Sequence, residues 1–248
     1  KAKRIIEIAK KFNILGNFNL KTSKIAASAD LCKADLASQM VFEFPELQGI
    51  MGEYYYKDID IEVSETLSQH YLPKGRSDEL PKTILSKIIS LSDRFDNLAS
   101  AFSLKLYPTG SSDPYGLRRS CIGIIRITES LDIKIDLNEI LDSSFTQVDL
   151  SVKNKTDKES KQKAKHFILD RVKNYYVENG FSVNILNSVL ETNKEINIKS
   201  ISNKINAIKN LTGTPALEKG VEIFKRLKNI TKNNNSEIIN ETLLTNNY

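Results

Sequence analysis

The spacing of apolar residues between positions 82 and 106 restricts the fold most. Large apolar side chains recur there at intervals of four and three, at Ile84, Ile88, Leu91, Phe95, Leu98 and Phe102. That spacing places all six on one side of an α-helix. Small polar residues occupy the opposite side, namely Ser86, Ser90, Asp93, Asn97 and Ser100. Solvated helix faces usually carry Lys and Glu, so this side either packs closely or lines a cleft, or it is a weakly optimised surface.

The rest of the chain follows the same spacing. Only 10 glycines and 6 prolines interrupt the 248 residues, and apolar residues recur at three and four rather than at two. We therefore predict an all-α protein. The predicted helices cover residues 1–14, 22–43, 46–56, 58–71, 82–106, 114–130, 137–149, 160–179, 182–191, 195–210 and 215–231.

The charge balance permits a nucleic-acid partner without requiring one. Lys and Arg number 36 against 31 Asp and Glu, a formal charge of +5, and 40% of the residues are hydrophobic. This composition is typical of a globular protein with one large core or two smaller ones. We find no apolar run long enough to span a membrane and no signal peptide, so we expect a cytoplasmic location. The chain begins at Lys1 inside a helical pattern, so we expect a piece of a longer protein.

Two further features concern cysteines and a linker. Cys32 and Cys121 lie far apart within apolar helical patterns, so we expect buried hydrophobic residues rather than a redox or zinc pair. The stretch from Ser151 to Ser160 is polar and rich in lysine, which is typical of a linker.

The stretch PTGSSDPYGLRRS, residues 108–120, has two interpretations. Asp113 and Pro114 fit the N-cap and first position of a helix. Arg118, Arg119 and Arg126 then fall on its polar side, and the first two oppose the positive end of the helix dipole. A carboxylate of the same chain would offset that charge, and so would a phosphate from outside. The hydroxyls and N–H groups of residues 109–112 would help to hold such a phosphate.

Several stretches together resemble the β subunit of bacterial glycyl-tRNA synthetase. They are LCKADLASQMVFEFPELQGIMGEYY (31–55), LSQHYLPKGRSDELP (67–81), LSDRFDNLASAF (91–102), PTGSSDPYGLRRSCIGIIRI (108–127) and FILDRVKNYYVENGFSVNILNSVL (167–190). The resemblance covers nearly the whole chain. It implies an HD-domain-like helical bundle over residues 1–150, a linker over 151–163, and a further helical region over 164–248 that leads towards an anticodon-binding-like domain.

The HD-like label can be compared with the residues present. In metal-dependent HD phosphohydrolases a histidine, a His-Asp pair and a distant aspartate hold the metal. Asp93 takes the position of that distant aspartate, but Lys33 and Asp35 stand where the His-Asp pair would be, and His70 is one of only two histidines. A lysine ammonium repels a divalent cation, so we expect no metal here. Asp93 is then expected to pair with a neighbour such as Lys33.

The resemblance implies a non-catalytic part of glycine–tRNA ligase. The whole enzyme would be a heterotetramer of two α and two β subunits, with ATP, Mg²⁺ and the active site in the α subunit; we find no ATP-binding motif and expect no cofactor in this chain. The β subunit would recognise tRNA(Gly). The candidate contacts are Arg118, Arg119, Arg126, Lys105, Thr109 and Ser111. The alternatives are a structural helical spacer or α-subunit contact region, and an HD-type phosphohydrolase.

Overall fold

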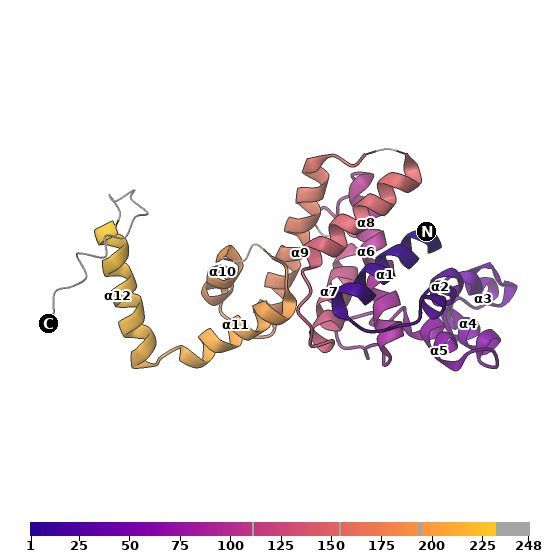
Figure 1. The fold of residues 1–248 in the computed structure, drawn as a ribbon, viewed down its shortest axis with the longest axis horizontal. Coiled ribbons are helices and arrows are strands. Elements are labelled where there is room, and N and C mark those ends of the chain that lie inside the picture. The colour runs from indigo at the N-terminus through magenta and orange to yellow at the C-terminus, as the bar shows by residue number, and fades with distance from the viewer. Residues whose placement is uncertain (111, 154, 193–194, 232–248) are drawn as a thin grey trace. The chain divides into compact units, whose positions relative to one another are not determined.

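The computed structural model describes residues 1–110, 112–153, 155–192 and 195–231. These residues form twelve α-helices and no β-strand, which confirms the all-α prediction. The chain divides into two compact units, Lys1–Ile205 and Asn206–Tyr248 (Figure 1). None of the described helices combines the length and the apolar character that crossing a membrane requires.

The helices match the predicted ones closely, except between residues 22 and 43 and at the start of α7. They are α1 (Ala2–Gly16), α2 (Thr22–Leu31), α3 (Gln39–Glu43), α4 (Ile50–Tyr56), α5 (Ile61–Gln69), α6 (Ile84–Ser103), α7 (Leu117–Ser130), α8 (Leu137–Val152), α9 (Lys158–Glu178), α10 (Val183–Thr192), α11 (Ile198–Leu211) and α12 (Pro215–Thr231). Two short 3₁₀ turns, Ala34–Ala37 and Pro45–Leu47, lie between them.

The single helix predicted over residues 22–43 is wrong. Lys33 leaves the helical conformation, with φ −123° and ψ 8°, so α2 ends at Leu31. Ser38 then starts α3, because its hydroxyl oxygen accepts from the Val41 N–H at 3.2 Å. The chain therefore forms separate short helices between residues 22 and 43, in place of one long helix.

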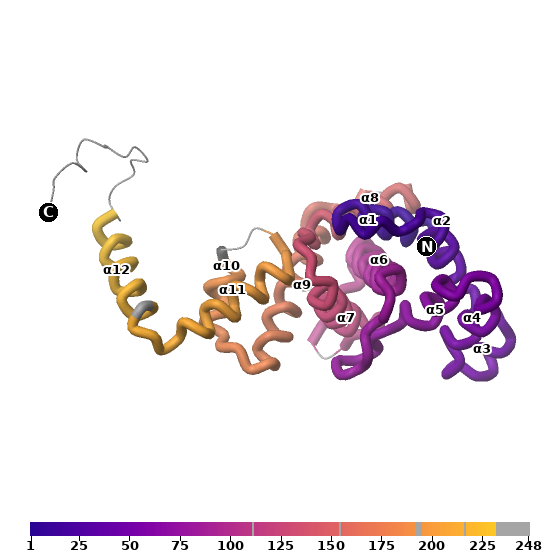
Figure 2. The backbone as a smooth tube through the Cα atoms, turned by 60° about the horizontal axis from the view of Figure 1, so that its bottom comes forward, coloured from indigo at the N-terminus to yellow at the C-terminus, as the bar shows by residue number. Residues whose placement is uncertain are grey.

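Helix α6 is the centre of unit 1. It contacts α1, α2, α5, α7, α8 and α9, and Figure 2 shows its tube with α1 and α8 on one side and α7 on another. Five of the six residues of the predicted stripe are buried, whereas Ile84 at its start is 38% exposed. The core therefore forms around this stripe, as its spacing predicts.

The small polar side of α6 packs closely against its neighbours. Ser86, Ser90 and Asp93 on this side are buried. The Ser86 hydroxyl lies 3.0 Å from that of Thr66 in α5, and the Ser90 hydroxyl donates to the Leu72 carbonyl at 2.8 Å. Small hydrogen-bonding side chains let α5 and the segment after it approach α6, so the weakly optimised surface is excluded.

Gly123 in α7 lets a buried arginine pass between α6 and α7. The side chain of Arg94 in α6 is buried. A Cβ atom at position 123 would lie 2.2 Å from the Arg94 Nε atom, so any other residue there would force the Arg94 side chain to move. Glycine is therefore favoured at this position by close packing rather than by its backbone conformation.

The predicted linker lies inside unit 1. Helix α8 ends at Val152 and α9 begins at Lys158, with Asp157 accepting from the Ser160 N–H at 2.7 Å. Helix α9 packs on α6, α7 and α8.

The HD-like and anticodon-binding-like domain assignments stay predictions. Cys32 and Cys121 are buried free thiols, as expected.

Candidate functional site

The residues at the HD-motif positions come together around Lys33. The Lys33 ammonium lies 3.1 Å from Asp93 Oδ2 and 2.9 Å from His70 Nε2, and 3.8 Å above the centre of the Tyr71 ring. Lys1 reaches the other carboxylate oxygen of Asp93 at 2.8 Å. The predicted pairing of Asp93 with Lys33 is thus confirmed. We call Lys1, Lys33, His70 and Asp93 the Lys33 cluster.

Burial and charge oppose each other in this cluster. Burial disfavours the Asp93 carboxylate, but the ammonium groups of Lys33 and Lys1 outweigh it and hold the pKa of Asp93 well below the usual range. Burial lowers the pKa of Lys33, and the charge of Asp93 opposes that shift. The carboxylate and its lysine neighbours therefore form an ion pair that depends on both partners.

His70 is held neutral in one tautomer. Its Nδ1 atom lies 2.8 Å from the Leu67 carbonyl oxygen, which can only accept, so Nδ1 carries the proton. Nε2 then accepts from the Lys33 ammonium, which can only donate. Burial, and then the charge of Lys33, lower the pKa of His70 to about 3. Neither ring nitrogen is left for a metal or a substrate.

Asp35 does not join the Lys33 cluster but forms a hydrogen bond elsewhere. One of its carboxylate oxygens accepts from the Gly49 N–H at 2.5 Å, just before α4. In the described part of the chain, no three His, Cys, Asp or Glu side chains are grouped so that they could hold a metal ion. An ammonium group at the centre of the Lys33 cluster also repels a divalent cation. The residues present therefore do not fit the metal of an HD phosphohydrolase.

Helix α7 begins later than predicted. Its first residue is Leu117, preceded by Gly116 at φ 63°, so the predicted start at Pro114 is wrong. The Gly116 N–H donates to the Asp113 carbonyl at 3.1 Å and closes a turn first. Asp113 nevertheless caps the helix, because its carboxylate accepts from the N–H groups of Leu117 and Arg118 at 2.8 and 2.9 Å.

Two of the three candidate arginines on α7 bind carbonyl oxygens of their own chain. Arg118 donates to Gly110 at 2.6 Å and to Ser112 at 3.2 Å. Arg126 donates to Gly75 at 3.1 Å and to Asp78 at 2.8 Å. Each therefore fixes a loop, Arg118 the loop before α7 and Arg126 the loop before α6.

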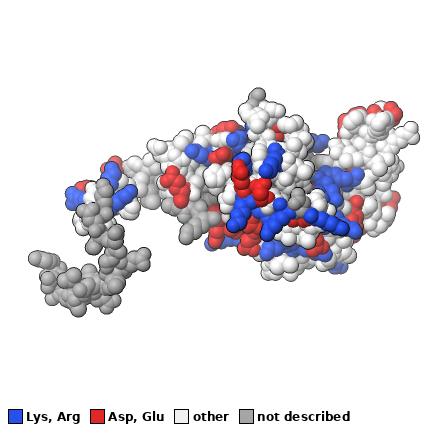
Figure 3. Space-filling model, turned by 90° about the horizontal axis from the view of Figure 1, so that it is seen from above, with Lys and Arg blue, Asp and Glu red and all other residues white. Residues whose placement is uncertain are grey.

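Arg119 differs from its neighbours. It is exposed, and no described residue forms a hydrogen bond or ion pair with its side chain. It lines a pocket with Lys74 and Arg94. Lys and Arg also gather with scattered acidic groups on the face of the molecule shown in Figure 3. Arg119 is thus the candidate contact that is available to an outside anion.

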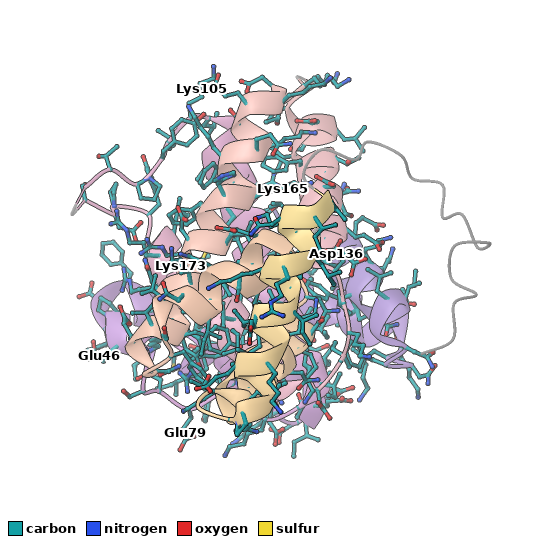
Figure 4. All side chains as sticks on the ribbon, turned by 90° about the vertical axis from the view of Figure 1, so that its left-hand side faces the viewer. Glu46, Glu79, Lys105, Asp136, Lys165 and Lys173 are labelled. Carbon is teal, nitrogen blue, oxygen red and sulfur yellow. The ribbon has the colours of Figure 1, made fainter. Side chains whose placement is uncertain are left out.

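The remaining candidates lie apart. Lys105 pairs with Asp157 at 3.3 Å. Lys105 lies at one edge of the view in Figure 4. Glu79, which marks the loop that Arg126 binds, lies at the opposite edge. Thr109 is exposed, and its carbonyl closes a turn with the Ser112 N–H at 2.8 Å. Ser111 lies outside the described residues.

The sequence analysis missed an exposed apolar surface over residues 36–61. Nine of the large apolar side chains in this segment are at least 43% exposed, and Phe42 reaches 79%, whereas Val41 is buried. They are Leu36, Met40, Phe42, Phe44, Ile50, Tyr54, Tyr55, Ile59 and Ile61. The same segment carries five acidic residues and one lysine. The run FEFPEL was the available signal, because Pro45 cannot continue the helix predicted before it.

Comparison with known proteins gives one consistent family. A family model described as "Glycyl-tRNA synthetase beta subunit" matches residues 1–191. A "Glycine--tRNA ligase beta subunit" of Trichodesmium erythraeum (strain IMS101) is 40% identical over 78% of this chain and 27% of its own length. Those of Buchnera aphidicola subsp. Schizaphis graminum (strain Sg) and Methylobacillus flagellatus are 37% and 31% identical, over 90% and 97% of this chain and 32% and 35% of their own lengths. The chain thus spans between about a quarter and about a third of the lengths of these relatives.

Proposed function

Since this chain belongs to the glycyl-tRNA synthetase β subunit family, we propose that it is a non-catalytic, tRNA-contacting part of a glycine–tRNA ligase. The family match over residues 1–191 is the observation that carries this proposal. The α subunit would hold ATP, Mg²⁺ and the active site, in a cytoplasmic enzyme of two α and two β subunits. The partners of His70 support a non-catalytic role, since they leave no free base in the Lys33 cluster.

The RNA contact would centre on the start of α7. Arg119 supplies a free guanidinium, and a guanidinium binds two phosphate oxygens at once. Arg118 and Arg126 have five N–H donors each, so bonds to two carbonyls leave donors for phosphate. Such contacts fix position without reading base sequence. Lys105, Thr109 and Ser111 would extend the surface past the loop.

Binding of the chain to tRNA(Gly) is expected to weaken as salt increases. About three phosphate contacts give a slope of log affinity against log salt of roughly −2 to −3. Arg119→Glu should weaken binding about tenfold and make that slope shallower by about 1. Fluorescence anisotropy over a KCl series measures both.

Lys57→Glu is the matched control, since it makes the same charge change on the exposed lysine of the 36–61 surface. It should leave the affinity near that of the unaltered chain. Affinity that is independent of salt, or equal losses in the two variants, would contradict the proposed RNA surface.

A second candidate function is contact with the α subunit through the 36–61 surface. Nine exposed large apolar side chains within one segment are typical of a protein interface, and the acidic residues of that segment disfavour RNA. Family membership supplies a subunit partner. This function is compatible with RNA contact at α7.

Phe42→Ser with Phe44→Ser in the full-length β subunit should weaken its association with the α subunit at least tenfold. Both side chains are more than half exposed, so folding should be preserved. Analytical ultracentrifugation of the mixed subunits measures the association, and tRNA binding by β alone should not change. An unaltered assembly would rule out this contact.

A further inference from the structure

A pocket of about 330 Å³ lies where the segment after α5, the middle of α6 and the start of α7 meet. The side chains that matter in its lining are Tyr71, Lys74, Arg94, Tyr115, Arg119 and Ser120. Three of them are cationic, and none of the residues that line the pocket is an aspartate or a glutamate. The pocket thus concentrates positive charge from three separate parts of the chain.

Arg94 is the least usual of the three. It is only 7% exposed, and no described carboxylate forms an ion pair with it. Its Nη2 atom donates to the carbonyl oxygens of Pro73 and Tyr71 at 2.8 and 3.3 Å, while Nε is buried without a partner. Burial lowers the pKa of Arg94 to about 10, and the charge of the adjacent Asp93 opposes that shift, so the group is still charged at neutral pH. Asp93 forms its ion pairs with two lysines instead, so Arg94 is a buried cation without an ion-pair partner of its own, which is costly.

Lys74 and Arg119 add two exposed charges at the same place. No described residue pairs with either side chain. Other arginines nearby do have partners: Arg76 pairs with Glu178, and Arg118 binds loop carbonyls. Unpaired positive charge in this region therefore gathers at the pocket.

We propose that this pocket is a phosphate-binding site in which Arg94, Arg119 and Lys74 supply the positive charge. A phosphate carries more negative charge than a carboxylate and offers several acceptor oxygens, which suits two guanidinium groups and an ammonium. The hydroxyls of Tyr115 and Ser120 line the same pocket and can donate as well. The phosphate could belong to a small free ligand or to an RNA backbone. The inference rests on the pocket and not on the proposed tRNA function.

Titration of the full chain with inorganic phosphate tests the proposal directly. The buffer contains no phosphate, and KCl holds the ionic strength constant. Calorimetry should show saturable binding of one phosphate per chain. Lys74→Gln and Arg119→Gln should each weaken it about tenfold or more, which corresponds to about 1.4 kcal/mol. Both residues are exposed, so these variants should fold.

Arg226→Gln is the matched control, because it makes the same change at an exposed arginine that pairs with Glu222 in α12 and does not line the pocket. It should bind phosphate like the unaltered chain. Absence of saturable binding, or equal losses in the Arg226 and Arg119 variants, would overturn the proposal.

Two competition experiments separate the sources of the phosphate. If the pocket holds an RNA phosphate, a short single-stranded RNA without a terminal phosphate should displace inorganic phosphate, and Lys74→Gln should weaken RNA binding. If the ligand is small and free, pyrophosphate should displace inorganic phosphate and the RNA should not. If the chain binds phosphate but not tRNA, the proposed tRNA function is contradicted and the phosphate site is not. If the chain binds tRNA equally well with Lys74→Gln and does not bind phosphate, the phosphate site is contradicted and the tRNA function is not.

Discussion

Replacement of Asp93 by asparagine should lower the free energy of unfolding by about 3 kcal/mol at neutral pH. Asp93 is 6% exposed and lies between the ammonium groups of Lys33 and Lys1. An amide there leaves Lys33 charged and largely buried without a carboxylate partner. Loss of one partner of a buried pair costs 3–5 kcal/mol, and the partial exposure of both lysines favours the lower end of about 3.

Urea unfolding of the unaltered chain and the Asp93→Asn variant measures this difference. Glu7→Gln is the control, because Glu7 forms an exposed ion pair with Lys10. Such a pair should contribute less than about 1 kcal/mol to the free energy of unfolding. Adding Lys33→Met to Asp93→Asn should recover part of the loss, since it removes the unpaired charge. Equal stability of the Asp93→Asn variant and the unaltered chain would show that the pair does not stabilise the fold.

Acid should destabilise the chain over an unusually wide range because of His70. The unfolded imidazole binds its proton near the ordinary pKa of 6.5, whereas the folded one does so only near about 3. Between these values the unfolded state holds more protons, so stability falls as the pH drops from 6.5 towards 3. The slope for one such group approaches about 1.4 kcal/mol per pH unit. The lowered pKa of Asp93 adds a second loss, which begins below its unfolded pKa of about 3.8.

The unfolding free energy measured between about pH 4.5 and 6.5 isolates the histidine, since Asp93 titrates lower in both states. His70→Gln keeps an amide donor and an acceptor but cannot titrate, so its profile should be flatter by close to 1 kcal/mol per pH unit. His166→Gln, at an exposed histidine, is the control and should retain the slope of the unaltered chain. Parallel profiles for His70→Gln and the unaltered chain would contradict the buried neutral histidine.

The sequence predicted the features that depend on periodicity and on local motifs. Apolar spacing identified α6, and its small polar residues indicated the close packing on the other side. The motif comparison placed Lys33 against Asp93. These inferences succeeded because helical geometry fixes which residues share a face, and because the resemblance aligned the two segments that carry Lys33 and Asp93.

Partners far apart in the chain could not be predicted in this way. Arg126 donates to carbonyls 51 and 48 residues earlier, and backbone carbonyls carry no sequence signal. The break after Leu31 depends on Lys33 turning towards Asp93 and on Ser38 starting a new helix, so tertiary contact overrides local propensity there. Arg94 occupies a position next to the apolar stripe, and only the packing around Gly123 reveals where its side chain goes.

Helix α7 holds two loops that flank the same pocket. Arg126 donates hydrogen bonds to the loop that follows Lys74, and Arg118 donates hydrogen bonds to the loop that precedes Tyr115. One helix therefore sets the positions of two parts of the pocket lining relative to each other. Replacing either arginine would release one of these loops, which could then move independently of the other loop.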